Sequence, residues 1–205
     1  MSIFVNSKNY YFVTPNNKNG LSSSLPTNLH KSDSLEFICE LKVNPKKMKK
    51  LKYPGYIISL NGKHLGIYAG PDYVGSSIWT TTGEHKITLF PGDDIKSKIS
   101  VHLKIDIKNK LMELTVKGKN SKSKKINFDG EIDEDYQFSY LWIGCGNGMD
   151  KNLSFPLIAK ISKVKIIKNN KTIVKSDCKR QTPYKVFDQS NSGNHLIKYD
   201  KEWFE

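Results

Sequence analysis

Residues 99–117 read ISVHLKIDIKNKLMELTVK, and this stretch decides the class of fold. Apolar and polar side chains alternate on both sides of its short polar centre. Successive side chains of a β-strand point to opposite faces, so the alternation predicts two antiparallel strands, each with one buried face. The predicted buried face of the first run contains Val101, Leu103, Ile105 and Ile107. A one-residue slip in register would expose this whole set, which fixes the pairing.

Further strand-like runs lie at regular spacing along the chain. YLWIGCGN covers residues 140–147, and IAKISKVKII covers residues 158–167. Other predicted strands cover residues 10–13, 35–43, 56–60, 78–82 and 86–90. Many short strands without a long amphipathic helix are typical of an all-β antiparallel sandwich. We expect loops at residues 14–30 and at residues 44–54, where a lysine cluster interrupts the strand pattern.

The C-terminal residues 184–199 read YKVFDQSNSGNHLIKY, with a polar turn between two strand-like runs. Asp188 and Ser190 are expected to cap backbone N–H groups in this turn. Gly193 and Asn194 tolerate the left-handed backbone that a tight reversal needs. The segment therefore predicts a turn that joins two strands.

The turn has the form D-x-S-x-x-G-N-H, which resembles an element of laminin G-like jelly rolls in the concanavalin A-like superfamily. The stretches YLWIGCGN and IAKISKVKII resemble later strands of the same family. The resemblance implies a single jelly-roll domain over residues 1–205, a length at which sandwiches routinely form one domain. The D-x-S element usually stands near the start of such a domain, and here it stands near the end. It either closes the same sandwich, which we favour because termini often lie close together, or forms a tail that binds a ligand.

Cysteine usage and the N-terminus bear on the compartment. Cys39, Cys145 and Cys178 are odd in number and widely spaced, which leaves at least one thiol unpaired and offers no C-x-x-C pair. The N-terminal residues lack the basic and apolar segments of a signal peptide, and no apolar run approaches the length of a membrane span. We therefore expect synthesis in a reducing cytoplasm, with any role outside the cell reached in a virion or by a non-classical route.

The chain carries a formal net charge of +13, with lysine clusters that could attract phosphate. The clusters comprise Lys46, Lys47, Lys49, Lys50 and Lys52, and further along Lys119, Lys122, Lys124 and Lys125. Arg180 is the only arginine, although arginine forms the bidentate contacts typical of nucleic-acid sites. The composition therefore favours a solvated basic surface over a nucleic-acid site. An acidic polysaccharide, lipid A phosphates or an anionic membrane surface would suit the same charge.

An acidic segment at residues 130–135, GEIDED, resembles the E-I-D-x-E strand of laminarinase-type glucanases. That resemblance implies Glu131 and Asp135 as the nucleophile and the acid/base of a retaining hydrolase, with Asp133 assisting. Asp135 stands where the family has glutamate, and no Trp-Pro platform precedes the segment. We favour a solvated acidic loop and keep glycoside hydrolysis as an alternative.

Aromatic residues at positions 61–79, NGKHLGIYAGPDYVGSSIW, suggest a shallow binding surface on loops above a rigid sandwich. Sugars stack their apolar faces on aromatic rings, while amides and carboxylates bind the hydroxyl groups. The candidate ligand-binding residues are Asn61, Tyr68, Asp72, Tyr73 and Trp79. Burial in the core is the competing interpretation for tryptophans in alternating runs. We favour the core for Trp142 and leave both possibilities open for Tyr73.

A calcium site is a weaker possibility. Asp188, Asn191 and Asn194 offer the oxygen ligands that calcium takes, and the resemblance implies a calcium at the rim of the domain. Side chains from one turn fall short of the usual coordination number, so we favour turn capping and expect no cofactor.

These observations favour a non-catalytic domain that binds a glycan or acidic polysaccharide, or that serves as an attachment surface. One alternative is a structural or assembly protein, such as a virion or surface component, that uses the sandwich for protein contacts or self-association. The other alternative is the glucanase-like hydrolase.

Overall fold

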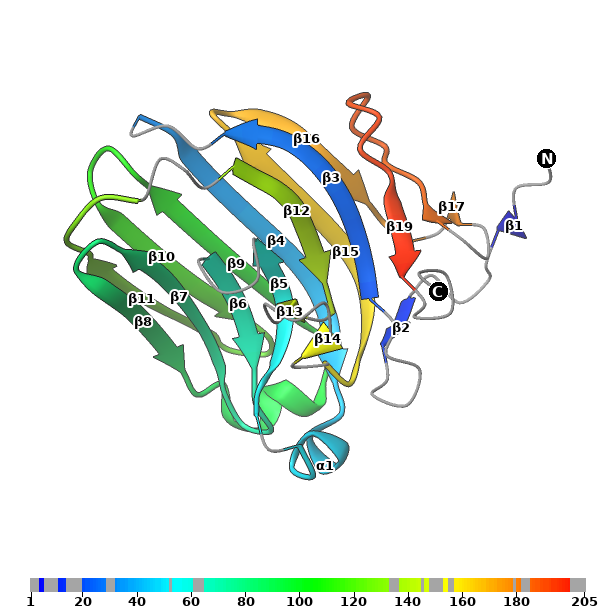
Figure 1. Ribbon diagram of the computed structural model, residues 1–205. Coiled ribbons are helices and arrows are strands. Elements are labelled where there is room, and N and C mark those ends of the chain that lie inside the picture. The colour runs from blue at the N-terminus through cyan, green and yellow to red at the C-terminus, as the bar shows by residue number, and fades with distance from the viewer. Residues whose placement is uncertain are drawn as a thin grey trace.

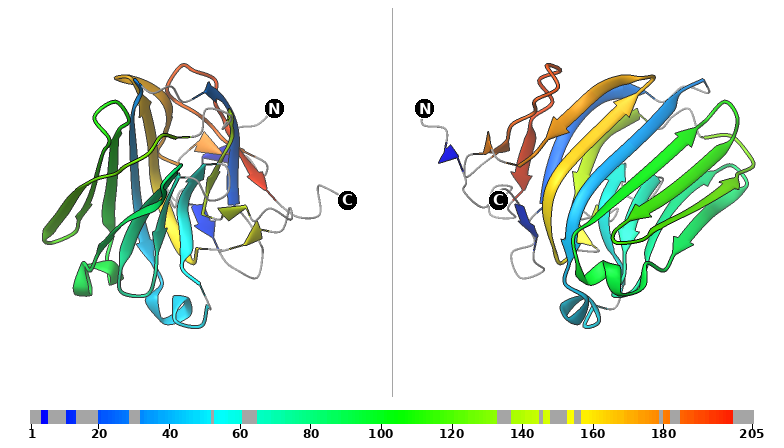
Figure 2. Two further views of the ribbon diagram at one scale, coloured as in Figure 1. Left: turned by 60° about the vertical axis from the view of Figure 1, so that its left-hand side comes forward. Right: turned by 180° about the vertical axis from the view of Figure 1, so that it is seen from behind.

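A computed structural model describes residues 4–5, 11–13, 20–28, 32–51, 53–60, 65–132, 137–144, 146–147, 153–154, 157–178, 180–181 and 185–199. Within these residues the strands pair into two large antiparallel sheets and one short two-stranded sheet (Figure 1). The front sheet has the order β1-β17-β18-β19-β3-β12-β5-β6-β7-β8, and the back sheet has the order β11-β10-β9-β4-β15-β16, with β2 also paired to β15. Figure 2 shows the two sheets stacked as layers, with the back sheet toward the viewer in its right-hand view.

The front-sheet strands are β1 (Phe4–Val5), β3 (Gly20–Asn28), β5 (Gly55–Leu60), β6 (Leu65–Ala69), β7 (Val74–Thr80), β8 (Gly83–Leu89), β12 (Gln137–Ile143), β17 (Arg180–Gln181), β18 (Lys185–Val186) and β19 (Leu196–Tyr199). The back-sheet strands are β2 (Tyr11–Val13), β4 (Ser34–Val43), β9 (Ile99–Asp106), β10 (Leu111–Lys117), β11 (Ser121–Asn127), β15 (Ala159–Lys168) and β16 (Lys171–Ser176). A short separate pair contains β13 (Gly146–Asn147) and β14 (Leu153–Ser154). Two single-turn helices are α1 (Pro45–Met48) and the 3-10 helix η2 (Gly92–Lys96).

The hairpin predicted from the alternating stretch is confirmed. β9 and β10 pair antiparallel, with Leu103 opposite Leu114. In the turn, the Asp106 carboxylate accepts hydrogen bonds from the Asn109 backbone N–H at 3.0 Å and the Asn109 amide at 2.7 Å. The residues predicted for the buried face are all buried: Val101, Leu103, Ile105 and Ile107. Local alternation and an aspartate-capped turn therefore specify this unit together.

The core lies between the two sheets. Alternate residues of β4 are buried, from Leu35 through Phe37 to Val43, and the inward residues of the front sheet, such as Ile67 and Ile78, are equally enclosed. Each such side chain contributes about 1.5–3 kcal/mol when it is fully removed from water. The predicted all-β antiparallel sandwich is confirmed.

Two predicted loops are corrected. Residues 20–28 form β3, although they lie inside the expected loop at residues 14–30. This polar strand pairs on both sides, with β12 and with β19, so backbone hydrogen bonds to distant segments determine its conformation. The expected loop at residues 44–54 contains α1, where the Asn44 side chain accepts a hydrogen bond from the Lys47 N–H at 3.2 Å. The strand expected at residues 78–82 ends at Thr80, where a turn leads into β8.

The C-terminal segment closes the sandwich, as favoured from the sequence. β18 and β19 pair with each other, and β19 extends the front sheet by pairing with β3. Val186 and Leu196 are fully buried at the paired positions. The segment is thereby part of the same front sheet as the central strands.

Candidate functional site

A hollow of about 550 Å³ opens on the outer face of the front sheet. Its aromatic lining consists of Tyr56, Tyr68, Tyr73 and Phe90, and we call it the tyrosine hollow. On β6, Ile67 and Ala69 point into the core, so Tyr68 between them must point outward. Strand register then places Tyr56 directly opposite Tyr68.

Glycines let the tyrosine rings lie flat on the neighbouring backbone. A Cβ atom added at Gly75 would meet the Tyr68 ring at 2.3 Å, and one added at Gly66 would meet the Tyr56 ring at 2.5 Å. A Cβ at Gly70 would likewise lie 2.2 Å from the Tyr73 ring. Aromatic rings that cover strand glycines restore the packing that the missing side chains would provide. The positions of Tyr56 and Tyr68 are therefore fixed by the sheet, and that of Tyr73 by the turn between β6 and β7.

The rings form a chain across the hollow. The ring centroids of Tyr56 and Tyr68 are 6.2 Å apart, those of Tyr68 and Tyr73 are 6.3 Å apart, and both pairs meet edge to face. Phe90 continues the chain at 6.1 Å from Tyr73 and is 58% exposed. Edge-to-face contacts at this spacing are favourable and hold the rings in place.

Polar groups surround the rings. Lys86 Nζ lies 2.6 Å from a Glu84 carboxylate oxygen, and the hydrogen bond to Glu84 raises the pKa of Lys86. Burial raises the pKa of Tyr56 and of Tyr68, although a hydrogen bond to Thr88 opposes the change at Tyr68. The phenols therefore stay protonated near neutral pH, beside one carboxylate and one ammonium group. This combination offers apolar stacking surfaces together with hydrogen-bond donors and acceptors.

The structure brings three of the five predicted ligand residues together. Tyr68, Asp72 and Tyr73 all line the tyrosine hollow. Trp79 is 41% exposed and lies two residues beyond Ser77, a lining residue, on the same face of β7, but Trp79 itself is outside the lining. Asn61 is outside the described residues. A role for these side chains in binding stays a prediction.

Sequence reasoning missed the contribution of β5 and β8. Tyr56, Glu84, Lys86, Thr88 and Phe90 also line the hollow. Four of them occupy alternate positions from residue 84 to residue 90, a period-two pattern that was available in the sequence. The missing information was the strand order, which places β8 beside β7 and turns these side chains to the outer face.

Trp142 is buried, as predicted, at 9% exposure. It pairs with Ser59, while its neighbours Leu141 and Ile143 belong to the inter-sheet core. Since adjacent residues of a strand face opposite sides, Trp142 is buried on the outer side of the front sheet.

The predicted catalytic strand is not formed at Glu131. This residue lies in the loop between β11 and β12, where its backbone N–H donates to Thr81 Oγ1 at 3.0 Å. Its half-exposed carboxylate is 3.3 Å from Lys110 Nζ. Asp133 and Asp135 are outside the described residues. The loop placement agrees with the solvated acidic loop that the sequence favoured.

The calcium candidate Asp188 acts as a turn cap. Its carboxylate accepts hydrogen bonds from the Lys175 N–H at 2.8 Å, the Ser190 N–H at 2.9 Å, the Ser190 hydroxyl at 2.6 Å and the Asn194 N–H at 3.1 Å. Four donors occupy the lone pairs that a cation would need. The left-handed backbone is confirmed at Gly193 but is wrong for Asn194, because Asn191 adopts it instead.

The described residues contain no group of three or more His, Cys, Asp or Glu side chains that could hold a metal ion. Cys39 and Cys178 are buried thiols, and burial raises the pKa of Cys39 well above its usual range. Cys145 is outside the described residues. The thiolate is the reactive form of cysteine, so Cys39 is chemically protected.

The sequence matches no protein-family model and no curated protein. Solved structures share the fold. A candidate carbohydrate-binding protein from Bacteroides ovatus matches with a TM-score of 0.61 at 12% identity, over 92% of this chain and 57% of that chain. The CBM40 domain of Ruminococcus gnavus IT-sialidase, bound to α2,3-sialyllactose, matches with a TM-score of 0.53 at 14% identity, over 77% of this chain and 88% of that chain.

The chain thus spans little more than half the length of the Bacteroides protein that it matches. At these identities the likeness shows the fold, which is a concanavalin A-like jelly-roll sandwich. The resemblance to this superfamily, drawn from the C-terminal motif and the later strands, is confirmed at the level of the fold.

Proposed function

We propose that this protein is a non-catalytic glycan-binding or attachment domain, extending over residues 1–205, whose sugar site is the tyrosine hollow. The observation that carries the proposal is the chain of aromatic rings on the outer face of the front sheet. Similar folds in the Bacteroides and Ruminococcus proteins support a carbohydrate ligand, because the latter is a sugar-bound domain.

The geometry suits a sugar for three reasons. The apolar C–H face of a pyranose can lie on Phe90, which is 58% exposed, or on the neighbouring half-buried Tyr73 ring. Hydroxyl groups can bind Glu84, Lys86 and the exposed Asp72 carboxylate at the edge of the hollow. The rings are held by the backbone beneath them, so binding immobilises little that was free before.

The test is a glycan array with the purified protein, followed by affinity measurements on any sugar that is retained. Tyr73→Ala removes the central stacking surface, and we expect a loss of affinity of about two- to tenfold, which corresponds to the typical free energy of an aromatic contact. Tyr53→Ala is the matched control, because Tyr53 is an exposed tyrosine outside the lining. Trp79→Ala reports whether the ligand extends along β7.

If Tyr73→Ala binds sugar as well as the parent does and has the same thermal unfolding midpoint, the sugar does not bind in the tyrosine hollow. Failure to retain any glycan on a broad array would favour the assembly alternative, which light scattering can test as a concentration-dependent oligomer. Release of reducing sugar that is abolished by Glu131→Gln would instead establish the hydrolase.

A further inference from the structure

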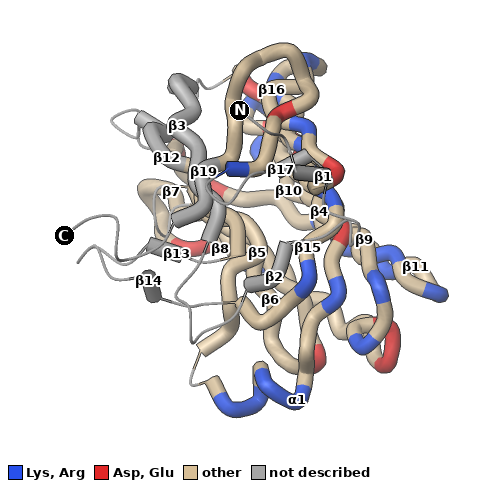
Figure 3. Tube along the Cα trace, turned by 90° about the vertical axis from the view of Figure 1, so that its right-hand side faces the viewer, with Lys and Arg blue, Asp and Glu red and all other residues tan. Residues whose placement is uncertain are grey.

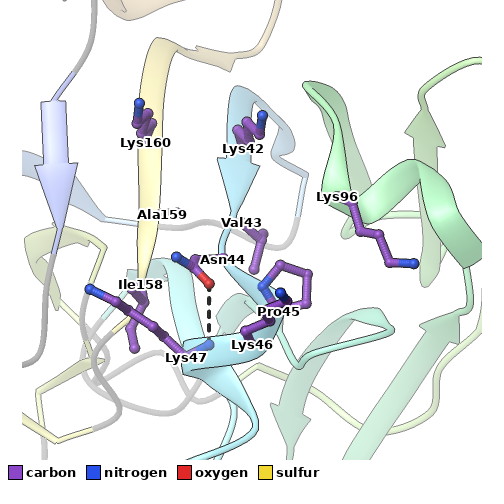
Figure 4. Close-up of a pocket in the computed structure, with 10 residues that line it drawn as sticks. All are labelled: Lys42, Val43, Asn44, Pro45, Lys46, Lys47, Lys96, Ile158, Ala159 and Lys160. Carbon is purple, nitrogen blue, oxygen red and sulfur yellow. Dashed lines mark hydrogen bonds between the residues drawn. The ribbon is translucent and has the colours of Figure 1, made fainter.

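A second hollow, of about 420 Å³, lies at the end of the sandwich where α1 and η2 meet the back sheet. Five lysines from four elements surround it (Figure 4): Lys42 of β4, Lys46 and Lys47 of α1, Lys96 of η2 and Lys160 of β15. No acidic residue lines this hollow among the described residues. We call it the lysine groove.

The strand register forces like charges together in the lysine groove. Lys42 and Lys160 are directly opposite each other on paired strands. Like charges at directly opposed positions destabilise a sheet, because the two side chains share one face. The next cations, Lys46 and Lys47, stand on a helix that begins two residues after β4 ends. The fold therefore gathers lysines from β4, β15 and α1 at this end of the sandwich.

The same strands neutralise their lysines a short distance away. Glu40, two residues before Lys42 on β4, lies 2.6 Å from Lys98 Nζ and 3.2 Å from Lys163 Nζ. Within the described part of the chain, Lys42, Lys46 and Lys47 have no such carboxylate partner, while Lys96 pairs with Asp93 on its own helix. Lys42, Lys46 and Lys47 therefore bring positive charge to the groove without the carboxylate partner that Lys98 and Lys163 have in Glu40.

The surroundings of the groove are apolar as well as cationic. Its lining between the lysines consists of Asn44 and the apolar residues Val43, Pro45, Ile158 and Ala159. Tyr53, in the loop after α1, is 52% exposed. Figure 1 places α1 at the lower end of the sandwich, and Figure 3 shows α1 there as a run of basic residues. The groove lysines and the exposed Tyr53 ring therefore belong to the same end of the molecule.

From this arrangement we propose that the end of the sandwich formed by the lysine groove and Tyr53 docks on an anionic lipid bilayer. Lipid phosphates bind the lysine ammonium groups, and the Tyr53 ring and the partly exposed Pro45 lie against the interfacial region of the bilayer. Lysines near an anionic surface and aromatic rings at the headgroup level are the two elements of such binding. The described residues include no helix long and apolar enough to span a bilayer, so the contact is peripheral.

Two features favour a bilayer over a nucleic acid. The groove cations are all lysines, which act as point charges and lack the bidentate geometry that arginine offers to phosphates and bases. They also converge on an apolar lining, whereas a nucleic-acid groove follows the backbone and stacks bases. An amphiphilic anion matches both the charge and the apolar surface.

The test is co-sedimentation of the whole chain with vesicles of phosphatidylcholine alone and with vesicles that contain phosphatidylserine. We expect binding to the anionic vesicles only. Lys46→Ala with Lys47→Ala should weaken the partition coefficient about 25-fold, since each lysine near the surface contributes about fivefold. The matched control is Lys124→Ala with Lys125→Ala on β11, which makes the same change in net charge at exposed positions.

Equal losses in the two double variants would overturn the assignment to the groove, because whole-protein charge would then explain the binding. Binding to inositol hexakisphosphate or to duplex DNA without binding to anionic vesicles would overturn the bilayer as the partner. Tyr53→Ala should weaken vesicle binding while leaving binding of inositol hexakisphosphate unchanged, and an equal effect on both would also contradict the proposal. None of these measurements involves the sugar site, so glycan binding and lipid binding can fail independently.

Discussion

The tyrosine hollow and the lysine groove differ in what holds their side chains. In the hollow, three tyrosine rings rest on glycine backbone, and each ring is packed against the next. In the groove, five lysines surround an apolar lining, with Lys42 and Lys160 directly opposed. Packing forces are short-ranged and insensitive to salt, whereas charge interactions at exposed sites are screened by ions. The first region is therefore rigid before a ligand arrives, and the second depends on its ionic surroundings.

Among the predictions, we expect the largest effect from Gly75→Ala in the tyrosine hollow. The new methyl group would lie 2.3 Å from the Tyr68 ring, so the ring must move or the strand must shift. We expect a loss of about 1–3 kcal/mol in the free energy of unfolding, the usual range for overpacking, measured by urea denaturation. Sugar binding should fall with it, because the ring chain is disrupted.

A double-mutant cycle provides the control for this change. In a Tyr68→Ala background the ring is absent, and Gly75→Ala should then cost much less than in the parent. Additive changes in the free energy of unfolding would show that Gly75 is needed for a reason other than contact with the Tyr68 ring. The hollow would then not be held by ring packing.

Salt should weaken binding at the lysine groove but not at the tyrosine hollow. Raising the salt concentration from about 0.05 M to about 0.5 M shortens the screening length roughly threefold, and we expect vesicle binding to weaken by at least about tenfold. Sugar retention should change by less than about twofold over the same range, because stacking and hydroxyl hydrogen bonds are not screened. A salt-sensitive sugar interaction would mean that Lys86 or another charge dominates the hollow.

Glu40→Gln removes the carboxylate that pairs with Lys98 and Lys163, so it adds one net positive charge beside the groove. We expect vesicle binding to rise by about fivefold, the effect of one added positive charge near an anionic surface.

The hydrogen bond from Lys98 lowers the pKa of Glu40, with Lys163 contributing in the same direction. A lowered pKa contributes stability above the ordinary carboxylate pKa, and this is lost as the pH falls through the lowered value.

The thermal unfolding midpoint, measured as the pH is lowered, tests the contribution of Glu40 to stability. The parent should lose stability as Glu40 is protonated, and Glu40→Gln should lack this part of the decline. If the thermal unfolding midpoints of the parent and of Glu40→Gln fall equally at acidic pH, the ion pairs of Glu40 add nothing measurable to the stability of the fold.

The smallest expected effect concerns the pH dependence of sugar binding. Burial raises the pKa of Tyr56, Tyr68 and Tyr73 above their ordinary value, so all three phenols remain protonated at neutral and mildly alkaline pH. Affinity for a neutral sugar should therefore vary by less than about twofold between about pH 6 and about pH 9. A steep change in isothermal titration across this range would identify another titrating group in the hollow.

Regions with strong local signals were predicted well from the sequence. The β9–β10 hairpin has period-two alternation and an aspartate-capped turn, and its antiparallel pairing and its buried face agree with the prediction. Asp188 and Ser190 cap the C-terminal turn as expected, because such hydrogen bonds join residues only a few positions apart. β3 could not be predicted in this way, since its polar residues become a strand only by pairing with β12 and β19.

The sequence by itself determined the all-β class, the alternation that builds the core, and a set of aromatic residues, Tyr68 and Tyr73 among them, suited to a sugar. Only the tertiary structure decided that these tyrosines meet Tyr56 and Phe90, and that Lys42 stands opposite Lys160. The physical reason is that periodicity within a strand is a local property, whereas strand order and register depend on which distant segments share backbone hydrogen bonds. Both candidate surfaces of this protein are products of that long-range pairing.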